Sequence, residues 1–311
     1  MLPNSPLTTS EAGYTTDSGA ESLPPKKINK TKPVLPAPRC PLHQLKTFRH
    51  FSQTDSKMSN FFSPYLWNLR DKRVDDWPLM SSPWATIISS LLYWIISLKL
   101  GPSFMSTRPA YELKKTIQFY NLIQILLSSY LFYECGVSGW FTHYNWLCQN
   151  IELDQNGLRM AQVSYMYYLS KFLEFCDTFF FILRKKDKHV SKLQLLHHGL
   201  MPIYGWILVR WLPGGHETFG GAFNSLVHVV MYLYYFLASF GLKIWWKKYL
   251  TTFQMFQFFC VFSHSAILVF GVVEPCGYPW QFSLVSLAMM SLFFVLFAEF
   301  YVQSYSTKKE K

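Results

Sequence analysis

The sequence predicts an all-α membrane protein with seven transmembrane helices. Only 15% of its 311 residues are charged, whereas soluble domains carry about 25% charged side chains. Half of the residues are hydrophobic, and they gather in runs near the roughly 20 residues that a helix needs to cross a bilayer core of about 30 Å. Lys and Arg concentrate in alternate connections between these runs, as the positive-inside tendency predicts. The expected spans are 84–100, 116–133, 160–183, 193–211, 222–240, 249–273 and 279–302.

The N-terminal segment, residues 1–60, is expected to be a disordered extension. It is rich in Pro, Ser, Thr and Lys and poor in large apolar residues, so it lacks the means to form a packed core. Asn29 opens an Asn-Lys-Thr sequon that would be glycosylated only if this basic segment reached the luminal side of a membrane. The seven-helix domain is expected over 61–305. The tail, 306–311, reads "STKKEK" and resembles a cytosolic dilysine signal for retrieval to the endoplasmic reticulum.

The basic connections predict the orientation of the spans. Three connections are rich in Lys and Arg, and the three that alternate with them contain neither residue. We therefore expect the basic connections and the C-terminus in the cytosol, and the N-terminus across the membrane. The net charge of +11 thus reflects membrane topology and does not indicate nucleic-acid binding. The basic connections are 106–115, 183–192 and 242–250, and the others lie around 137–158, 212–221 and 274–280.

Two of the six cysteines are candidates for a disulfide. Cys148 and Cys276 both fall in connections expected on the non-cytosolic side, where oxidation is permitted. A bridge would tie the connection after the second span to the connection after the sixth. Two unpaired thiols are the alternative, and Cys135 is a competing partner.

Charged side chains interrupt the third span. Each costs roughly 2.5–3.5 kcal/mol inside a membrane helix on insertion scales, so each is a functional hypothesis. At about 100° per residue, Lys171, Glu174 and Thr178 fall within roughly 60° of one another, and Asp177 lies on the same side. A Lys–Glu pair that only neutralises itself between helices is the alternative.

Two adjacent histidines lie in the fourth span. Gln194, His197, His198 and Met201 share one helix face about 100° wide. The Gln194 amide could orient a histidine one turn away, because residues three and four apart are neighbours on a helix. The pair could be metal ligands, hydrogen-bonded core groups or a reactive centre.

The fifth and sixth spans also carry polar residues at helical spacing. Isolated stripes could be interhelical hydrogen bonds worth only about 0.6 kcal/mol each. Four successive stripes that contain a Lys, two carboxylates and three histidines are instead typical of a shared polar chamber. The fifth span contributes Asn224, His228, Met231 and Tyr235, flanked by Tyr232 and Tyr234, and the sixth contributes Gln254 and Gln257.

The three histidines that converge, His197, His198 and His228, favour nucleophilic acyl transfer. They could hold one zinc ion, but they are too few for the di-iron centre of a desaturase. A neutral imidazole attacks a thioester and hands the acyl group on. A second imidazole can act as general base, and amide or Lys donors can stabilise an oxyanion. We expect no bound cofactor or metal, and basic connections that meet a phosphate-rich carrier such as coenzyme A.

Several stretches in order resemble the ELO family of very-long-chain fatty acid elongases from about Asp71 to the end. "RVDDWPLMSSPW" and "GPSFMSTRPAYEL" resemble the family's lead-in and its GPxxMxxRxP loop. "KFLEFCDT" is similar to KxxExxDT, "NSLVHVVMYLYY" to NxxxHxxMYxYY and "TTFQMFQF" to TxxQxxQ. The departure is QxxHH in place of HxxHH, because Gln194 stands where the family has its first histidine.

The resemblance implies condensation of a long-chain acyl-CoA with malonyl-CoA to 3-oxoacyl-CoA, CO2 and CoA. It also implies six helices around an acyl-chain tunnel that opens to the cytosol, in the endoplasmic reticulum membrane. Ketoreductase, dehydratase and enoyl reductase are the expected partners, besides membrane lipid and the two CoA substrates, with a homodimer as a further candidate. An inactive or scaffolding homologue and a seven-helix transporter or receptor are the alternatives.

Combined with the polar stripes, the resemblance suggests a role for each residue. His197 is expected to take the acyl group, with His198 as the alternative nucleophile. His198 and His228 are candidates for stabilising the malonyl carboxylate, the enolate or the leaving imidazole. The expected hydrogen-bond donors to carbonyl oxygens are Gln194, Asn224 and Lys171, the orienting carboxylates are Glu174 and Asp177, and the further binding residues are Tyr232, Tyr235, Gln254 and Gln257.

Overall fold

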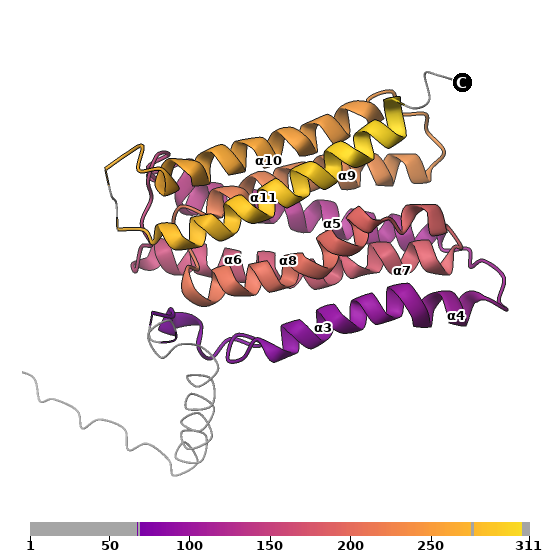
Figure 1. The fold of residues 1–311 in the computed structure, drawn as a ribbon, viewed down its shortest axis with the longest axis horizontal. Helices are drawn as coiled ribbons and strands as arrows, with labels where there is room; N and C mark the ends of the chain where they lie inside the picture. Colours follow the sequence, from indigo (N-terminus) through magenta and orange to yellow (C-terminus); the bar gives the residue numbers. More distant parts are fainter. Residues whose placement is uncertain (1–66, 68, 275–276, 307–311) are drawn as a thin grey trace, which may run out of the picture. The chain divides into compact units, whose positions relative to one another are not determined.

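The computed structural model describes residues 67, 69–274 and 277–306. The chain divides into two units, Met1–Arg49 and His50–Lys311, and every described residue belongs to the second. Within the described ranges the regular elements are helices and there are no strands. The long helices run alongside one another (Figure 1). They are α3 (Trp84–Ile95), continued by a π-helical turn (Ile96–Leu100) and α4 (Gly101–Met105), then α5 (Lys114–Cys135), α6 (Gln155–Leu173), α7 (Phe175–Leu183), α8 (Lys192–Trp211), α9 (Thr218–Ser239), α10 (Lys247–Val269) and α11 (Trp280–Tyr301).

These helices form seven long segments, because α3 runs into α4 and α7 directly follows α6. Each segment overlaps one span expected from the sequence. Four are long and apolar enough to cross a membrane by length and composition. The segments that contain α5, α6–α7 and α8 are less apolar, because they carry the polar side chains described below. The four membrane candidates are Trp84–Met105, Thr218–Ser239, Lys247–Val269 and Trp280–Ser304.

Local chemistry explains where the less apolar helices begin. Asp154 precedes α6, and its Oδ1 accepts the Gly157 amide at 2.8 Å. Ser191 precedes α8, and its hydroxyl accepts the Gln194 amide at 3.2 Å. Both are N-caps that satisfy amides left free in a first helical turn. Pro202 does not end α8, which continues to Trp211.

Arg210, at the end of α8, is almost fully buried and lies beside a carboxylate. Its Nη1 is 2.7 Å from Asp75 Oδ1, and its guanidinium lies over the Trp67 ring at 4.6 Å. The Asp71 amide donates to the Arg210 carbonyl at 3.1 Å. The segment before α3 is thereby held against the end of α8.

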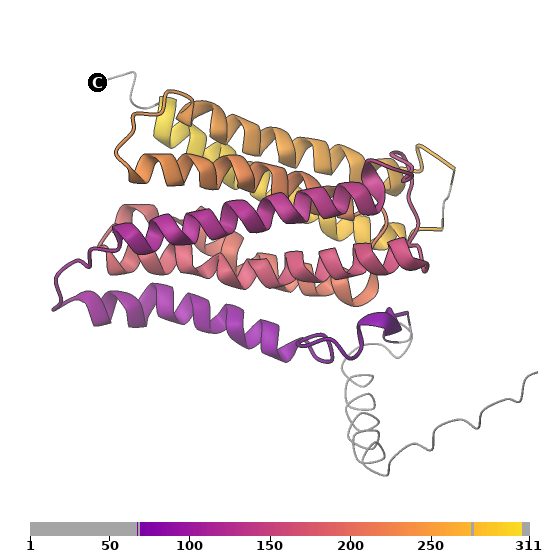
Figure 2. The same cartoon turned by 180° about the vertical axis from the view of Figure 1, so that it is seen from behind.

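The helices pack as neighbouring pairs. α5 contacts α9 and α10 contacts α11, while α6 and α3 both contact α8. Figure 2 shows α5 and α9 on the side opposite to α11. α3 lies at the edge of the helices, and its outer residues Ile88, Leu91 and Leu92 are exposed, as suits a lipid-facing surface (Figure 1).

Behind the histidines, α3 and α8 approach closely. The Trp94 indole donates to the Leu195 carbonyl at 2.9 Å. Gly199 is buried, and a Cβ at this position would meet the Trp94 ring at 2.3 Å. Only glycine therefore permits this contact.

The described cysteines answer part of the disulfide prediction. Cys148 is disulfide-bonded, whereas Cys135, Cys176 and Cys260 have free thiols. Cys135 is therefore not the partner of Cys148. Cys276 lies outside the described residues, so its pairing with Cys148 stays a prediction. Asn29, the segment 1–60 and most of the tail 306–311 also lie outside them.

Candidate active site

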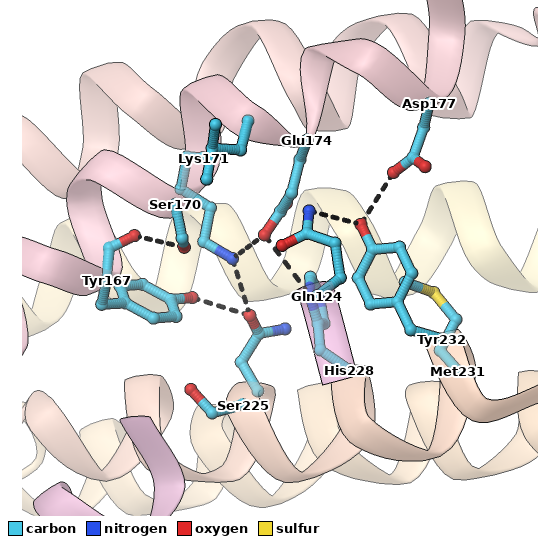
Figure 3. Close-up of polar contacts among 12 residues, drawn as sticks. Gln124, Tyr167, Ser170, Lys171, Glu174, Asp177, Ser225, His228, Met231 and Tyr232 are labelled. Carbon is cyan, nitrogen blue, oxygen red and sulfur yellow. Dashed lines mark hydrogen bonds and ion pairs between the residues drawn. The ribbon is translucent and has the colours of Figure 1, made fainter. Parts of the chain in front are cut away.

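A buried ion pair joins Lys171 and Glu174 at the end of α6. Lys171 Nζ donates to Glu174 Oε1 at 2.6 Å, and each side chain is about 2–3% exposed. His228 Nδ1, from α9, lies 3.3 Å from the same carboxylate oxygen. Figure 3 shows Lys171 and Glu174 reaching from α6 towards His228. The structure therefore brings together the charged pair of the third span and the histidine of the fifth.

Asn224 connects this group to two further helices. Its Oδ1 accepts hydrogen bonds from Lys171 Nζ at 3.2 Å and from Tyr167 at 2.8 Å. Its Nδ2 donates to Gln257 Oε1 on α10 at 3.3 Å. Because two donors face one amide oxygen, the orientation of the Asn224 side chain is fixed. The polar stripes of the third, fifth and sixth spans meet here.

The two histidines of α8 are held differently. His198 is buried, and its Nδ1 has no hydrogen-bond partner within the described part of the chain. His197 is half-buried, and its ring lies 4.8 Å from the Phe293 ring of α11, centroid to centroid. The two imidazole centroids are 5.2 Å apart. Both rings are thus placed by packing.

Gln194 does not orient a histidine. Its Nε2 donates to Thr178 Oγ1 on α7 at 3.2 Å. The same hydroxyl lies 2.8 Å from the Tyr93 hydroxyl of α3. Tyr93 in turn stacks on Phe175 and lies 6.5 Å from the His198 ring. Gln194 is therefore part of a hydrogen-bonded link between α8, α7 and α3.

Tyr93 was not expected from the sequence, although a signal was present. Thr86, Ser90, Tyr93 and Ser97 are all buried, and they recur at intervals of four, three and four residues. This spacing places them on one face of a helix. The same reasoning applies to Asn121, Gln124 and Ser128 of α5, which are also buried.

Asp177 and Tyr232 form a separate polar group. Tyr232 donates to Asp177 Oδ2 at 2.7 Å (Figure 3). Gln124 donates to Tyr232 at 3.3 Å and to Tyr120 at 2.8 Å. Neither Asp177 nor Tyr232 lines either of the cavities described next. The structure therefore places Asp177 between α5, α7 and α9. Glu174 lines neither cavity either, but it contacts His228, which lines one of them.

Two cavities meet at the histidines. The first, which we call the basic cavity, contains about 1100 Å³ of space, open solvent included. The second, the apolar cavity, contains about 750 Å³ on the same measure. Four residues line both cavities: His197, Asn224, Gln257 and Phe258.

The basic cavity contains most of the expected binding residues. Gln194, His198, His228, Tyr235 and Gln254 line it. Tyr235 is 39% exposed, and Gln254 donates to Met231 Sδ at 3.4 Å. Lys188, His189 and Lys247 line its outer end.

These outer residues make an electropositive mouth. Partial burial lowers the pKa of His189, and Lys247, Lys186 and Arg184 lower it further. His189 is thus neutral near pH 7, and the lysines supply the positive charge. Such a mouth attracts phosphate groups.

The apolar cavity extends away from the histidines between α6, α8, α9, α10 and α11. Its walls include Met201, Leu208, Val261 and Phe293. A long hydrocarbon chain would bury its surface here at about 25 cal/mol for each Å² of apolar area. Among the described residues, no group of three or more His, Cys, Asp and Glu side chains could hold a metal ion.

Comparisons with a family model and with individual proteins point to the same family. A family model described as "ELO: GNS1/SUR4 family" matches residues 78–311. A very long chain fatty acid elongase of Aedes aegypti is 43% identical over 254 residues, which cover 79% of this chain and 70% of that protein. Very long chain fatty acid elongase 7 of Drosophila melanogaster is 44% identical over 250 residues, 78% of this chain and 75% of that protein. Very long chain fatty acid elongase 4 of Mus musculus is 38% identical over 255 residues, 80% of each.

Proposed function

Because this chain belongs to the ELO (GNS1/SUR4) family, we propose that its two cavities hold the two parts of one acyl-CoA molecule. The protein is a multi-pass membrane enzyme of fatty acid elongation, a very-long-chain 3-oxoacyl-CoA synthase. The acyl chain occupies the apolar cavity and coenzyme A occupies the basic cavity. The thioester then lies where the cavities meet, beside His197. That His197 lines both cavities is the observation that carries the proposal.

In the first step, a nitrogen of the neutral His197 imidazole attacks the thioester carbonyl carbon. The carbon–sulfur bond breaks, CoA leaves as the thiol with the imidazole proton, and an acyl-histidine remains. Asn224 lines both cavities at this position, and the Lys171 ammonium, which donates to Asn224 Oδ1, stabilises through its charge the negative charge that develops on the carbonyl oxygen. His198 is the alternative nucleophile, but it lines only the basic cavity and not the apolar one.

In the second step, malonyl-CoA takes the place of CoA in the basic cavity. Loss of CO2 leaves the electron pair of the broken carbon–carbon bond on an enolate. The enolate carbon attacks the acyl carbon, the bond from that carbon to the imidazole nitrogen breaks, and the imidazole takes a proton from solvent, which gives 3-oxoacyl-CoA and restores neutral His197. His198 and His228 line the cavity that would hold the malonyl group, where they stabilise its carboxylate and the enolate. The Glu174 oxygen near His228 Nδ1 orients that ring.

The location, orientation and partner enzymes that we propose follow from the same family membership. The protein spans the endoplasmic reticulum membrane seven times, and the basic mouth faces the cytosol, where acyl-CoA and malonyl-CoA are supplied. Six of the spans surround the acyl chain, while α3 packs outside them. Ketoreductase, dehydratase and enoyl reductase partners consume the product. The alternative of an inactive homologue lacks support, because the imidazoles of His197 and His198 both line the basic cavity.

The test uses purified protein and acyl-CoA without malonyl-CoA. We expect one equivalent of free CoA and an acylated protein visible by intact mass spectrometry. His197→Ala should abolish both, and His189→Asn is the matched control that should preserve both. Release of CoA only when malonyl-CoA is present would exclude the acyl-enzyme. Loss in His198→Ala together with retention in His197→Ala would move the nucleophile to His198.

A further inference from the structure

A buried carboxylate, Glu217, lines the apolar cavity. It is 4% exposed, it belongs to none of the motifs above, and the reaction scheme does not use it. Glu217 directly precedes α9, so at about 1.5 Å per residue it lies roughly 16 Å from His228 along the axis of that helix. It is therefore far from the reacting carbon and close to the other end of the cavity.

This end of the cavity is closed. Every residue from 212 to 218, the connection from α8 into α9, is buried. Leu212, Glu217 and Thr218 line the cavity there. The Trp140 indole covers the same region and donates to Thr218 Oγ1 at 3.0 Å. A chain that enters from the histidines would therefore bring its last carbons to Glu217.

The Glu217 carboxylate does not cap its own helix, although acidic side chains favour that position. It makes no side-chain hydrogen bond to the first turn of α9. Instead, Oε1 accepts from Ser283 of α11 at 2.6 Å, and Oε2 accepts from Ser265 of α10 at 3.2 Å. The ion pairs of the described residues do not include Glu217.

These two hydrogen bonds leave acceptor capacity on the carboxylate. Each oxygen has two lone-pair sites, and three serines, Ser265, Ser283 and Ser286, lie within hydrogen-bonding reach of the carboxylate, so at least one of the four sites is left without a serine donor. A terminal methyl group packed here would leave the remaining sites without a partner, which is unfavourable in an apolar surrounding. A hydroxyl group on the last carbon would instead donate to them. A further polar pair lies nearby, because the Tyr204 hydroxyl is 2.8 Å from Ser286 Oγ and Tyr204 also lines the cavity.

We propose that Glu217, Ser265 and Ser283 form a binding site for a hydroxyl group at the ω end of the acyl chain. The enzyme then elongates ω-hydroxyacyl-CoA whose chain length brings the hydroxyl to Glu217. Shorter chains do not reach the carboxylate, so a terminal hydroxyl does not help them. This inference rests on the proposed function, in which the acyl chain occupies the apolar cavity.

The experiment measures malonyl-CoA-dependent elongation by the purified full-length enzyme with matched substrate pairs. The pairs are lauroyl-, palmitoyl-, stearoyl- and arachidoyl-CoA, each with its ω-hydroxy counterpart. We expect the ratio of kcat/KM, hydroxyl over methyl, to pass through a maximum at one length in the wild type. Glu217→Leu should lower that maximum roughly tenfold or more, because it removes a charge-assisted hydrogen bond and leaves the hydroxyl buried without a partner. Ser283→Ala should lower the ratio by a smaller factor, because the Glu217 carboxylate would lose one of the hydrogen bonds that hold it in place.

Two outcomes would overturn the inference. One is a wild-type ratio that is the same at every chain length. The other is an equal ratio in the wild type and in Ser283→Ala and Glu217→Leu at every length. If Glu217→Leu fails to fold, Glu217→Gln replaces it and should give a smaller decrease, because the amide keeps a neutral acceptor. Failure of the proposed function gives a different result, since no acyl-CoA of either kind would then release CoA in a His197-dependent manner.

Discussion

The side-chain amide of Gln194 donates to the Thr178 hydroxyl at 3.2 Å, which ties α8, the helix of His197 and His198, to α7. The position that departs from the family's histidine box therefore has a structural contact of its own. It holds the start of α8 against the segment that carries Glu174. The first prediction concerns this contact.

Gln194→Ala should lower kcat by roughly two- to tenfold, the effect of one neutral hydrogen bond of about 0.5–1.5 kcal/mol. Thr178→Val removes the same bond from the other side and should have a similar effect. If the bond is the cause, the double variant loses no more than either single variant. Steady-state elongation assays on the three variants measure this. Losses that multiply in the double variant would mean that Gln194 acts on the substrate directly.

Glu174→Gln should destabilise the protein strongly. It leaves the Lys171 ammonium buried without its carboxylate, and breaking a buried ion pair costs about 3–5 kcal/mol. We expect a clear fall in Tm by thermal denaturation in detergent. The paired variant Lys171→Met/Glu174→Gln should recover most of the Tm but none of the activity, because the oxyanion donor and the His228 partner are both gone. Recovered activity would show that the pair is only structural.

Asp177→Asn and Tyr232→Phe should affect stability more than chemistry. They disturb the hydrogen bond between α7 and α9, which lies outside both cavities. A fall of about 1–3 kcal/mol in unfolding free energy is expected from an unsatisfied buried group. CoA release per active enzyme should stay close to wild type. A loss of CoA release comparable to His197→Ala would place Asp177 in the reaction.

The mouth of the basic cavity should recognise CoA through its lysines. Lys188→Ala and Lys247→Ala should each raise KM for acyl-CoA about two- to fivefold at low salt, since exposed charge pairs contribute little individually. The effect should shrink as ionic strength rises. His189→Asn is the control at pH 7.5. The pKa of His189 is lowered below its usual value, so the ring is neutral at that pH and becomes charged only on acidification. Its substitution should change KM by less than about twofold at pH 7.5, and a larger change would assign His189 a direct contact.

The sequence could predict the helices and much of the polar site because both depend on periodicity. Lys171, Glu174, His228, Asn224 and Gln257 stand out as polar residues at helical spacing in apolar spans, and the structure brings them together. The partner of Gln194 could not be predicted in this way. Thr178 is on another helix, and contacts between helices depend on their relative rotation.

The positions of three other residues, Tyr93, Asp177 and Glu217, were harder to predict from the sequence. Tyr93 belongs to a stripe of Ser, Thr and Tyr on α3, and because these residues are common in membrane helices, the stripe by itself does not indicate a site. Asp177 follows Glu174 by three residues in the sequence, yet it points to a different group of partners. Glu217 lies in a connection between spans, where a carboxylate is ordinary. Only the packing of α10 and α11 against it shows that this carboxylate is buried.

The close approach of α3 to α8 has a consequence for His197 and His198. α3 lines neither cavity, but its Trp94 ring fills the space that a side chain at Gly199 would need. Gly199 follows His198 directly, so the backbone of the histidine turn rests on α3, whose outer side chains are exposed. We therefore expect a tilt of α3 in a thicker or thinner bilayer to shift the imidazoles, and the catalytic rate to depend on the thickness of the surrounding membrane.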